Sequence, residues 1–404
     1  MGVLRMAKKV FYLLKSHGVR GLKNSIDTSY GMTDIIEYYG WITDNKKIEL
    51  DEKQKAELGN RITVNWIIPD LDRGSGGHMN IFRFVSLLEG MGIHNRIYLF
   101  ASTRFENDTV FRKFLQENYS ASLSDPNIEA FSSTENIKYA HGTICTGWQT
   151  AYFVRKFDNT SFKFYFVQDF EPCFFPLGSE YLFAENTYKF GFRGITAGGW
   201  LKDKLRDEYG MKTESFGFSY DRDMYSPKEK HDNVQRLFFY ARPVTPRRAF
   251  EMGLLALNEI YKKKPNIEVV FAGWDISNYK IPFIHLNAGC AKIEELSELY
   301  AQCDICIVMS TSNLSLLPLE VMASNSVIAT SYGANNEWLL NEDNSILFEN
   351  DPKDIADKVL YYLDNPDELK KKREAGLKFA LATNWEDEAR KVYDFIMKEI
   401  EVDG

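Results

Sequence analysis

The segment STSNLSLLPLEVMAS, residues 310–324, carries a single carboxylate, Glu320, inside an apolar stretch that follows the strand-like run DICIVM. A glutamate is costly to bury without a partner, so this position needs an explanation. Pro318 suits the first position of a helix, which would leave the amides of Leu316 and Leu317 at the helix start, where free N–H groups attract phosphate. Glu320 could then hold a sugar hydroxyl of the same ligand, a combination that suits a nucleotide diphosphate. The alternative is a first-turn acid that is favoured only by the helix dipole.

Three arginines follow another strand-like run in the segment YARPVTPRRAF. Arg242 stands at the end of the strand, and Arg247 and Arg248 stand at the expected start of the next helix. Guanidinium groups in these positions could clamp a diphosphate through paired hydrogen bonds. The alternative is a solvated basic loop, but cations at a helix start oppose the helix dipole. The pattern therefore favours a phosphate-binding loop.

A glycine-rich segment, RGSGGH at residues 73–78, separates the first strand-like run from a helical pattern over residues 79–92. Gly76 and Gly77 could let the backbone approach a ligand closely, and His78 could reach the same place. The spacing is not GxGxxG, and no ribose-binding acid follows on a matching strand, which argues against a nicotinamide oxidoreductase. Tight turns also use glycines, and a lone histidine is more often structural.

Acidic residues form two further candidate sites. Asp169, in FVQDFEP, ends an apolar strand and could orient an acceptor hydroxyl or a donor sugar, or could simply cap the following turn. Asp70 with Asp72, and Asp221 with Asp223, have a DxD spacing that could hold a divalent cation and its diphosphate. Such spacings are common in polar turns, and the arginines offer another counter-charge, so we expect no metal and no other cofactor.

Length and composition limit the class of protein. A chain of 404 residues is too long for one core, and its net charge of −8 argues against general nucleic-acid binding. No apolar run reaches the length of a bilayer span and no signal peptide is visible, so we expect a cytoplasmic protein. The five cysteines are scattered, which fits a reducing compartment. Cys303 and Cys306 form a CxxC and are expected to be buried thiols rather than a redox or zinc site.

Residues 1–25 differ in charge from the rest of the chain. They hold six lysines and arginines and no acid, interleaved with apolar side chains. Such a segment could make peripheral contact with anionic lipid at the inner face of the cell membrane. The alternative is a solvated or packed basic helix.

Strand-like and helical runs alternate from about residue 62 onward, which predicts an α/β protein with mostly parallel sheets covered by helices. The run FGFSYDRDMYSPKEKHDN, residues 216–233, has the turn residues and charge of a linker. We therefore expect a basic helical extension at 1–60, a first Rossmann-like domain at 61–225 and a second at 226–385. Residues 386–404 are expected to form a C-terminal helix that could cross back to the first domain. Two doubly wound domains in tandem place their ligand in the cleft at the carboxyl ends of the strands.

Together these segments resemble the GT-B glycosyltransferases, in particular the large retaining family numbered four, over roughly residues 62–400. LSLLPLEVMASNSVIATSYGANNEWL resembles that family's E-G-F-G-L-x-x-x-E-A-M-A-x-G-x-P-V-I-A-T segment, and RPVTPRRAF resembles its G-R-x-x-x-x-K-G loop. GSGGH resembles the glycine loop of the first domain, and SFGFSYDRDMYSP resembles the entry to the second. The chain is also similar to the rhamnosyltransferases of bacterial surface-layer glycan assembly, of the WsaF type.

The resemblance implies a role for each matching residue. Arg242 and Arg247 match the basic pair on the diphosphate, with Arg248 as an alternative, and Glu320 matches the acid on the ribose hydroxyl. With Asp169 and His78, the arginines Arg242 and Arg247 are the candidate catalytic residues. The remaining donor-binding matches are Gly76 and Gly77 for the loop that faces the phosphate, Leu316 and Leu317 for the amides on the diphosphate, and Ala291 and Lys292 for the region that cradles the base.

Two departures from the family pattern bear on activity. The family's first glutamate, which faces the transferred sugar, is replaced by Ser312, and its first-domain His-Asp pair is replaced by Gln168 and Asp169. A 6-deoxy sugar presents different hydroxyls, so the lost acid could fit an unusual donor. It also leaves open a nucleotide-sugar-binding protein without catalytic activity.

The resemblance implies the transfer of L-rhamnose from dTDP-rhamnose to a sugar hydroxyl of a growing bacterial surface glycan. The acceptor would be a glycan or a lipid-linked oligosaccharide, and the reaction would need no metal and would retain the anomeric configuration. A transferase that uses a UDP- or GDP-sugar is the alternative within the same class.

Overall fold

The structure, a computed structural model, describes residues 34–71, 75–120, 123, 125 and 127–401. The chain forms two compact units that divide between Lys47 and Ile48. The smaller unit includes helix α2 (Ile35–Tyr39) and the 3-10 helix η1 (Gly40–Ile42). The basic segment 1–25, predicted as a membrane contact, lies outside the described residues. All features below belong to the unit that begins at Ile48.

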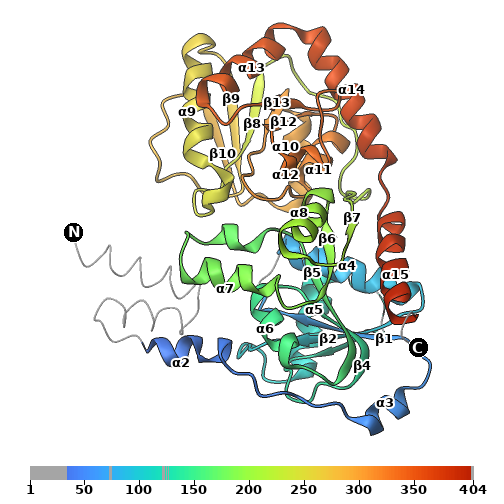
Figure 1. Cartoon of the computed structure of the whole chain (residues 1–404). Coiled ribbons are helices and arrows are strands. Elements are labelled where there is room, and N and C mark those ends of the chain that lie inside the picture. Colours follow the sequence, from blue (N-terminus) through green and yellow to red (C-terminus); the bar gives the residue numbers. More distant parts are fainter. Residues whose placement is uncertain (1–33, 72–74, 121–122, 124, 126, 402–404) are drawn as a thin grey trace. The chain divides into compact units, whose positions relative to one another are not determined.

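The first sheet of this unit has seven parallel strands in the order β3-β2-β1-β4-β5-β6-β7 (Figure 1). Its strands are β1 (Thr63–Ile68), β2 (His94–Leu99), β3 (Glu129–Phe131), β4 (Ala140–Cys145), β5 (Thr160–Val167), β6 (Arg193–Ala197) and β7 (Thr213–Phe216). Its helices are α3 (Glu52–Leu58), α4 (Gly76–Gly90), α5 (Asp108–Tyr119), α6 (Trp148–Lys156), η2 (Glu171–Phe174), α7 (Ser179–Thr187) and α8 (Gly199–Tyr209).

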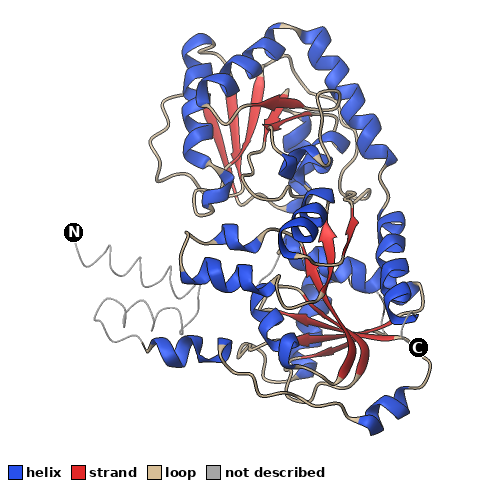
Figure 2. Cartoon of the chain, viewed as in Figure 1, coloured by secondary structure: helices blue, strands red, loops and turns tan. Residues whose placement is uncertain are grey.

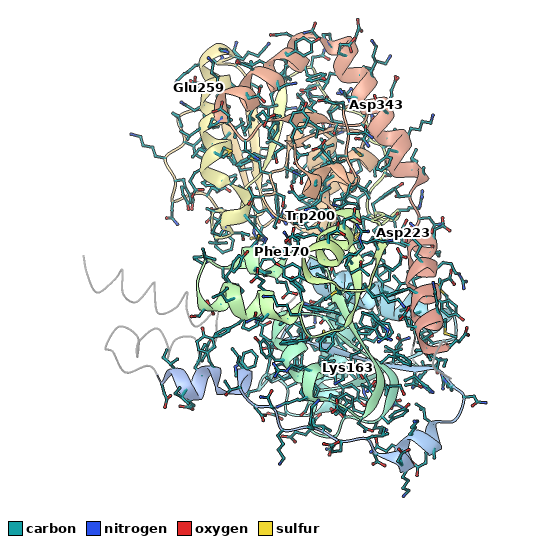
Figure 3. The ribbon with its side chains drawn as sticks, in the orientation of Figure 1. Lys163, Phe170, Trp200, Asp223, Glu259 and Asp343 are labelled. Carbon is teal, nitrogen blue, oxygen red and sulfur yellow. The ribbon has the colours of Figure 1, made fainter. Side chains whose placement is uncertain are left out.

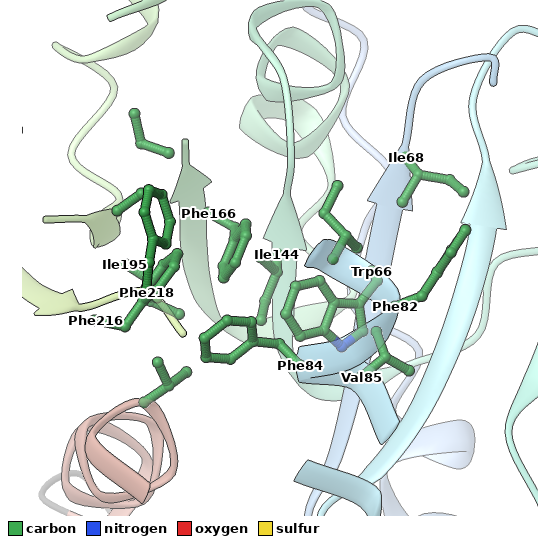
Figure 4. Packing of buried hydrophobic residues seen from close by; sticks show 14 of the residues in the cluster. Trp66, Ile68, Phe82, Phe84, Val85, Ile144, Phe166, Ile195, Phe216 and Phe218 are labelled. Carbon is green, nitrogen blue, oxygen red and sulfur yellow. The ribbon is translucent and has the colours of Figure 1, made fainter. Parts of the chain in front are cut away.

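Alternation along β5 separates the two faces of the first sheet, because successive side chains of a strand point in opposite directions. Phe166 points to the face covered by α4, where its ring centroid lies 5.3 Å from that of Phe84, and both rings contact Phe216 (Figure 4). Tyr165 points to the opposite face and packs on Tyr188, directly after α7, at 5.7 Å. Aromatic residues thus fill both layers between the sheet and its helices.

The second sheet has six parallel strands in the order β10-β9-β8-β11-β12-β13. Figure 2 shows the strands of both sheets in red and their helices in blue. Its strands are β8 (Arg236–Tyr240), β9 (Glu268–Ala272), β10 (His285–Gly289), β11 (Ile305–Ile307), β12 (Val327–Ser331) and β13 (Ile346–Phe348). Its helices are η3 (Pro246–Arg248), α9 (Phe250–Lys263), α10 (Ile293–Ala301), α11 (Leu317–Ala323), α12 (Ala334–Glu337), α13 (Pro352–Asp364) and α14 (Pro366–Ala382).

The same alternation organises the second core. Phe239 packs on Phe250 of α9 on one face of β8, and Phe238 packs on Tyr300 of α10 on the other. Both sheets are doubly wound, and the strand order reverses between β1 and β4 in the first sheet and between β8 and β11 in the second.

The last helix, α15 (Trp385–Glu401), packs against the first sheet although α14 packs against the second. Trp385 meets Phe84 of α4 edge-on, at 6.1 Å between ring centroids, and Glu388 accepts a hydrogen bond from the Gly217 amide at 2.6 Å. Figure 1 shows this passage from α14 to α15 in red. The chain therefore joins the two sheets twice, through residues 217–235 and again between α14 and α15.

The two joining segments are bound to each other. Arg222 donates hydrogen bonds to the carbonyls of Leu381 and Thr383, at 3.1 and 2.7 Å. The Thr383 hydroxyl donates to the Ser219 hydroxyl at 2.9 Å. A crevice of about 370 Å³ opens beside this junction, and its lining includes Gly217, Trp338 and Thr383.

The predicted fold class is confirmed, whereas some element boundaries were wrong. The helix predicted from residue 79 begins at Gly76, so Gly76 and Gly77 belong to its first turn rather than to a loop, with Ser75 as the N-cap residue. The sequence reasoning missed β3 and β7, because the first has three residues and the second, TESF, is mostly polar. The domain boundaries at 60, 225 and 385 remain predictions.

Two other expectations can be compared with the structure. Residues 48–58, which we assigned to the extension, are hydrogen-bonded to the first sheet: Ile48 pairs with Phe157, and the Tyr139 amide donates to Gln54 at 2.7 Å. Cys303 and Cys306 are buried, as predicted. No described helix combines the length and the apolar composition that crossing a bilayer would require.

Candidate functional site

The arginine loop lies at the point where the strand order of the second sheet reverses. The loops after β8 and β11 meet there, and Arg248 joins them by donating a hydrogen bond to the Ser310 hydroxyl at 2.8 Å. The Thr311 amide donates to the Arg247 carbonyl at 2.9 Å, which fixes the two loops side by side. Doubly wound sheets bind ligands at such reversals, so the fold places the three arginines where a ligand is expected.

The three arginines influence one another electrostatically. Burial lowers the pKa of Arg248, and the positive charges of Arg247 and Arg242 lower it further. Arg242 lies over the ring of Trp274, at 5.8 Å, and donates to the Gly273 carbonyl at 3.4 Å. Gathering like charges is unfavourable without an anion, so this cluster is suited to bind one.

Asp169 supplies a carboxylate to this cluster from the first sheet. Its Oδ1 accepts a hydrogen bond from the Asn313 amide at 2.8 Å, and its Oδ2 accepts one from the Ser312 hydroxyl at 2.9 Å. Arg247 Nε lies 3.5 Å from the same Oδ2. Burial raises the pKa of Asp169, while the Asn313 amide, Arg247 and Arg248 act in the opposite direction. The neighbouring Phe170 is labelled in Figure 3.

Asn313 was missed by the sequence reasoning and is central to this contact. Its side chain is 1% exposed and its Nδ2 donates to the carbonyls of Gln168 and Ala197, at 2.9 and 2.8 Å. Its Oδ1 accepts from the indole of Trp338 at 3.0 Å. One residue of the second sheet thus holds the ends of β5 and β6.

Gln168 connects Asp169 with the start of α4. Its side chain donates to the Gly77 carbonyl at 3.1 Å and accepts from Asn80 at 3.1 Å. His78, in the same helical turn, has its Nδ1 2.9 Å from the Ser75 hydroxyl. The predicted residues Gly76, Gly77 and His78 therefore lie at a helix N-terminus beside the Gln168–Asp169 segment.

Glu320 lies on α11, and its contacts differ from those of the arginines. Burial raises its pKa to about 7, the Tyr225 hydroxyl and Arg83 stabilise the charged form, and Asp221 opposes it. Burial lowers the pKa of Arg83, which stacks on Trp385 at 4.5 Å. The positive charge of Arg83 on α4 thus stabilises the ionised form of Glu320, an electrostatic influence that the sequence did not indicate.

The start of α11 differs slightly from the expectation. The helix begins at Leu317, so Pro318 occupies the second helical position rather than the first. The Leu316 carbonyl accepts from the amides of Leu319 and Glu320, at 3.0 and 3.3 Å. The amides of Leu316 and Leu317 therefore lie at the helix start, as expected.

The base-binding candidates lie after β10, at the same edge of the second sheet as the arginines. Ala291 is partly buried, and Lys292 is exposed and precedes α10, where its amide donates to Glu295 at 3.0 Å. Among the described residues, no hydrogen bond or ion pair joins Lys292 to the arginine cluster.

The acidic pairs have local partners. Asp70 accepts from the Ser102 hydroxyl at 3.1 Å and from the Leu71 amide at 3.0 Å, and Asp221 accepts from the Asp223 amide at 3.1 Å. Asp72 lies outside the described residues. Within the described part of the chain, no three histidine, cysteine or acidic side chains gather as a metal site would require.

Glu171, two residues after Asp169, has a distinct environment. It is 7% exposed, and its carboxylate accepts from the Trp148 amide at the start of α6 and from the Tyr165 hydroxyl, both at 2.8 Å. Burial raises its pKa to about 7, and the nearby Asp169 contributes in the same direction.

Solved structures with the same architecture include proteins described as glycosyltransferases. Sucrose-phosphate synthase from Thermosynechococcus elongatus superimposes with a TM-score of 0.64 and 13% identity over 85% of this chain and 100% of that one. Anabaena HepE, solved in complex with UDP-glucose, gives a TM-score of 0.58 and 11% identity over 84% of this chain and 99% of that one. The two sheets, their reversals and these neighbours define a GT-B fold.

Sequence comparison gives matches at higher identity than those structural neighbours. Residues 235–360 match the family described as WsaF, C-terminal domain. The chain is also 28% identical over 304 residues to the O-antigen biosynthesis protein RfbC of Myxococcus xanthus, a match that covers 74% of this chain and 24% of that much longer protein. Residues 235–360 thus resemble the WsaF C-terminal domain, and the chain has a GT-B fold, in agreement with the predicted resemblance.

Proposed function

We propose that this protein is a glycosyltransferase that moves a sugar from a nucleotide diphosphate onto a hydroxyl of a growing glycan. The observation that carries the proposal is the cluster of Arg242, Arg247 and Arg248 at the strand reversal of the second sheet, met by Asp169 from the first sheet. The name of the relative RfbC, in O-antigen biosynthesis, supports a glycan as the product.

The chemistry follows from the charges of these residues. Negative charge grows on the diphosphate as the bond to the sugar breaks, and preorganised cations stabilise that charge most in a dry site. Arg242 and Arg247 would bind the diphosphate, with Arg248 held behind them by Ser310. The amides of Leu316 and Leu317 would add two donors, and no metal is then required.

Other residues would orient the remaining parts of the donor and the acceptor. Glu320 would hold the ribose, and Ala291 and Lys292 would border the base. Asp169 would face the transferred sugar or the acceptor hydroxyl, a role supported by its position against Ser312, which stands at the first glutamate of the family pattern that the sequence resembles. Gly76, Gly77 and His78 would approach the phosphate from α4.

We further propose dTDP-rhamnose as the donor, with retention at the anomeric carbon. This choice rests on the resemblance to WsaF-type rhamnosyltransferases, and the match of residues 235–360 to the WsaF C-terminal domain supports that resemblance. The neighbour HepE was solved with UDP-glucose, so a UDP-sugar is the alternative. The acceptor would be a glycan or a lipid-linked oligosaccharide at the inner membrane face, where residues 1–25 would make peripheral contact.

A second candidate function is nucleotide-sugar binding without catalysis. Ser312 and Gln168 favour it, because both replace residues that act on the sugar in related transferases. In this protein Ser312 donates to Asp169 and Gln168 holds the start of α4.

The test begins with thermal shifts in dTDP, UDP and GDP, each with and without EDTA, because a ligand of the native state raises the melting temperature. Stabilisation by dTDP that resists EDTA supports the arginine clamp, and it should be reduced in Arg242→Met but kept in the exposed control Arg206→Met. Turnover of dTDP-rhamnose with a glycan acceptor separates an enzyme from a binder. Stabilisation by UDP alone would indicate a UDP-sugar in place of dTDP-rhamnose as the donor. Absence of a thermal shift with every nucleotide would refute the proposed nucleotide site.

A further inference from the structure

Asn313 joins the two sheets through every polar atom of its side chain. Its Nδ2 donates to the carbonyls of Gln168 and Ala197, and its Oδ1 accepts from Trp338. Its backbone amide donates to the Asp169 carboxylate at 2.8 Å. Asn313 is 1% exposed, so these four hydrogen bonds are shielded from water. Loss of one partner would leave a buried polar group without a hydrogen bond.

Trp338 fixes the direction in which the Asn313 amide points. An indole N–H can only donate, so the atom it faces must be the amide oxygen. The amide nitrogen is then directed at two carbonyls, which can only accept. A carboxylate at position 313 would therefore face two carbonyl oxygens and lie beside the carboxylate of Asp169, all of them acceptors.

The two carbonyls that Asn313 binds stand at the ends of β5 and β6. The Gln168 carbonyl belongs to the residue directly before Asp169, so this hydrogen bond fixes the backbone that carries the carboxylate. Ser312 and Arg247 complete the surroundings of Asp169. Among the described contacts none joins Asn313 to Arg242 or Glu320, the residues proposed for the diphosphate and the ribose.

We propose that Asn313 is a positioning residue for sugar transfer, which sets the Asp169 carboxylate against Ser312 and Arg247 and whose own orientation is set by Trp338. The proposal rests on the function proposed above. Asn313 does not touch the reacting atoms, so its loss affects the transfer step more than the binding of the donor nucleotide. Misplacing a reacting group by about 1 Å can lower a rate by roughly 100-fold.

The first test separates kcat from KM in the full chain. Asn313→Ser is expected to lower kcat by roughly 100-fold while the donor KM and the dTDP thermal shift stay near their original values. Asn313→Asp should lower kcat further than Asn313→Ser does. Trp338→Phe keeps an aromatic ring but loses the indole N–H, so it should lower kcat less. The matched control is Asn344→Ser, because Asn344 is also buried but bonds only locally, with its Oδ1 accepting from the Asn341 amide at 2.9 Å. A KM effect without a kcat effect would overturn the proposal.

The second test needs no activity. Hydrogen–deuterium exchange should become faster in peptides that cover residues 168–171 and 196–198 of Asn313→Ser, and should stay unchanged there in Asn344→Ser. Unchanged exchange at residues 168–171 would overturn the proposal even if the protein is a transferase. If the wild-type protein transfers no sugar, the proposed function fails while this measurement still decides whether Asn313 holds Asp169.

Discussion

The buried carboxylate of Glu171 makes stability depend on pH in a direction that can be stated in advance. Its pKa is raised from 4.5 to about 7, mainly by burial, against the two hydrogen bonds from Trp148 and Tyr165. An acid whose folded pKa lies above its unfolded pKa stabilises the fold most below the unfolded value. This contribution is lost as the pH rises from about 4.5 through about 7.

The magnitude follows from the two pKa values. One pKa unit corresponds to about 1.4 kcal/mol, so titration of Glu171 should cost the wild type about 2–3 kcal/mol of unfolding free energy between pH 5 and pH 8. Glu171→Gln cannot ionise. In this variant the glutamine amide oxygen can accept the hydrogen bond from the Trp148 amide. The glutamine amide nitrogen can donate to the Tyr165 hydroxyl, because a hydroxyl oxygen can accept as well as donate. The variant should therefore gain about 2–3 kcal/mol on the wild type over this interval.

The assay is urea unfolding at pH 5 and pH 8, followed by circular dichroism for the wild type, for Glu171→Gln and for the exposed control Glu386→Gln. The control should show the same difference from the wild type at both pH values. A difference between Glu171→Gln and the wild type that is also equal at pH 5 and pH 8 would refute the reasoning, because the carboxylate would then titrate alike in the folded and unfolded chains.

Three further predictions concern the site, the junction and the N-terminus. Glu320→Ala should weaken nucleotide binding, and Arg242→Ala should lower turnover more than ground-state binding; unchanged kinetics in both would contradict the site assignment. Gly198→Ala should destabilise the protein by about 3 kcal/mol in thermal or urea unfolding. The added carbon would lie 2.4 Å from the Trp338 ring, and the φ of Gly198 is +87°. The control Gly199→Ala should have a small effect, because its added carbon meets nothing within 4 Å. Deleting residues 1–25 should reduce binding to anionic vesicles, and equal binding would remove the membrane role.

Alternation of short apolar runs and helical patterns was sufficient to predict the fold. Strands such as FKFYFV are rich in residues that suit a pleated, buried surface, and their carboxyl ends meet at one edge of a parallel sheet. The positions of the arginine loop, Asp169 and the start of α11 at the carboxyl ends of strands could therefore be predicted from local sequence, whereas their roles remain predictions. The first turn of α4 was misplaced because glycines favour loops in isolation, whereas the helix begins at Gly76, with Ser75 as its N-cap residue.

The contacts that organise the site could not be predicted in the same way. Asn313 binds carbonyls 145 and 116 residues away along the chain, and its own segment reads as an ordinary polar loop. The electrostatic influence of Arg83 on Glu320 depends on α4 and α11 approaching each other, which no local spacing encodes. The environment of Glu171 likewise depends on Trp148 and Tyr165 from other elements.

The double connection between the sheets has a mechanical consequence. Because Arg222 and Thr383 bind the two joining segments to each other, the sheets are anchored along one line rather than at two independent points. Sliding one sheet past the other would break these bonds, whereas swinging about the line keeps them and instead stretches the hydrogen bonds of Asn313 to Gln168 and Ala197. The crevice beside the line is lined in part by Gly217 and Trp338. A molecule bound in this crevice would hinder the swing of the sheets, and with it the movement of the arginine cluster, without contacting the arginines.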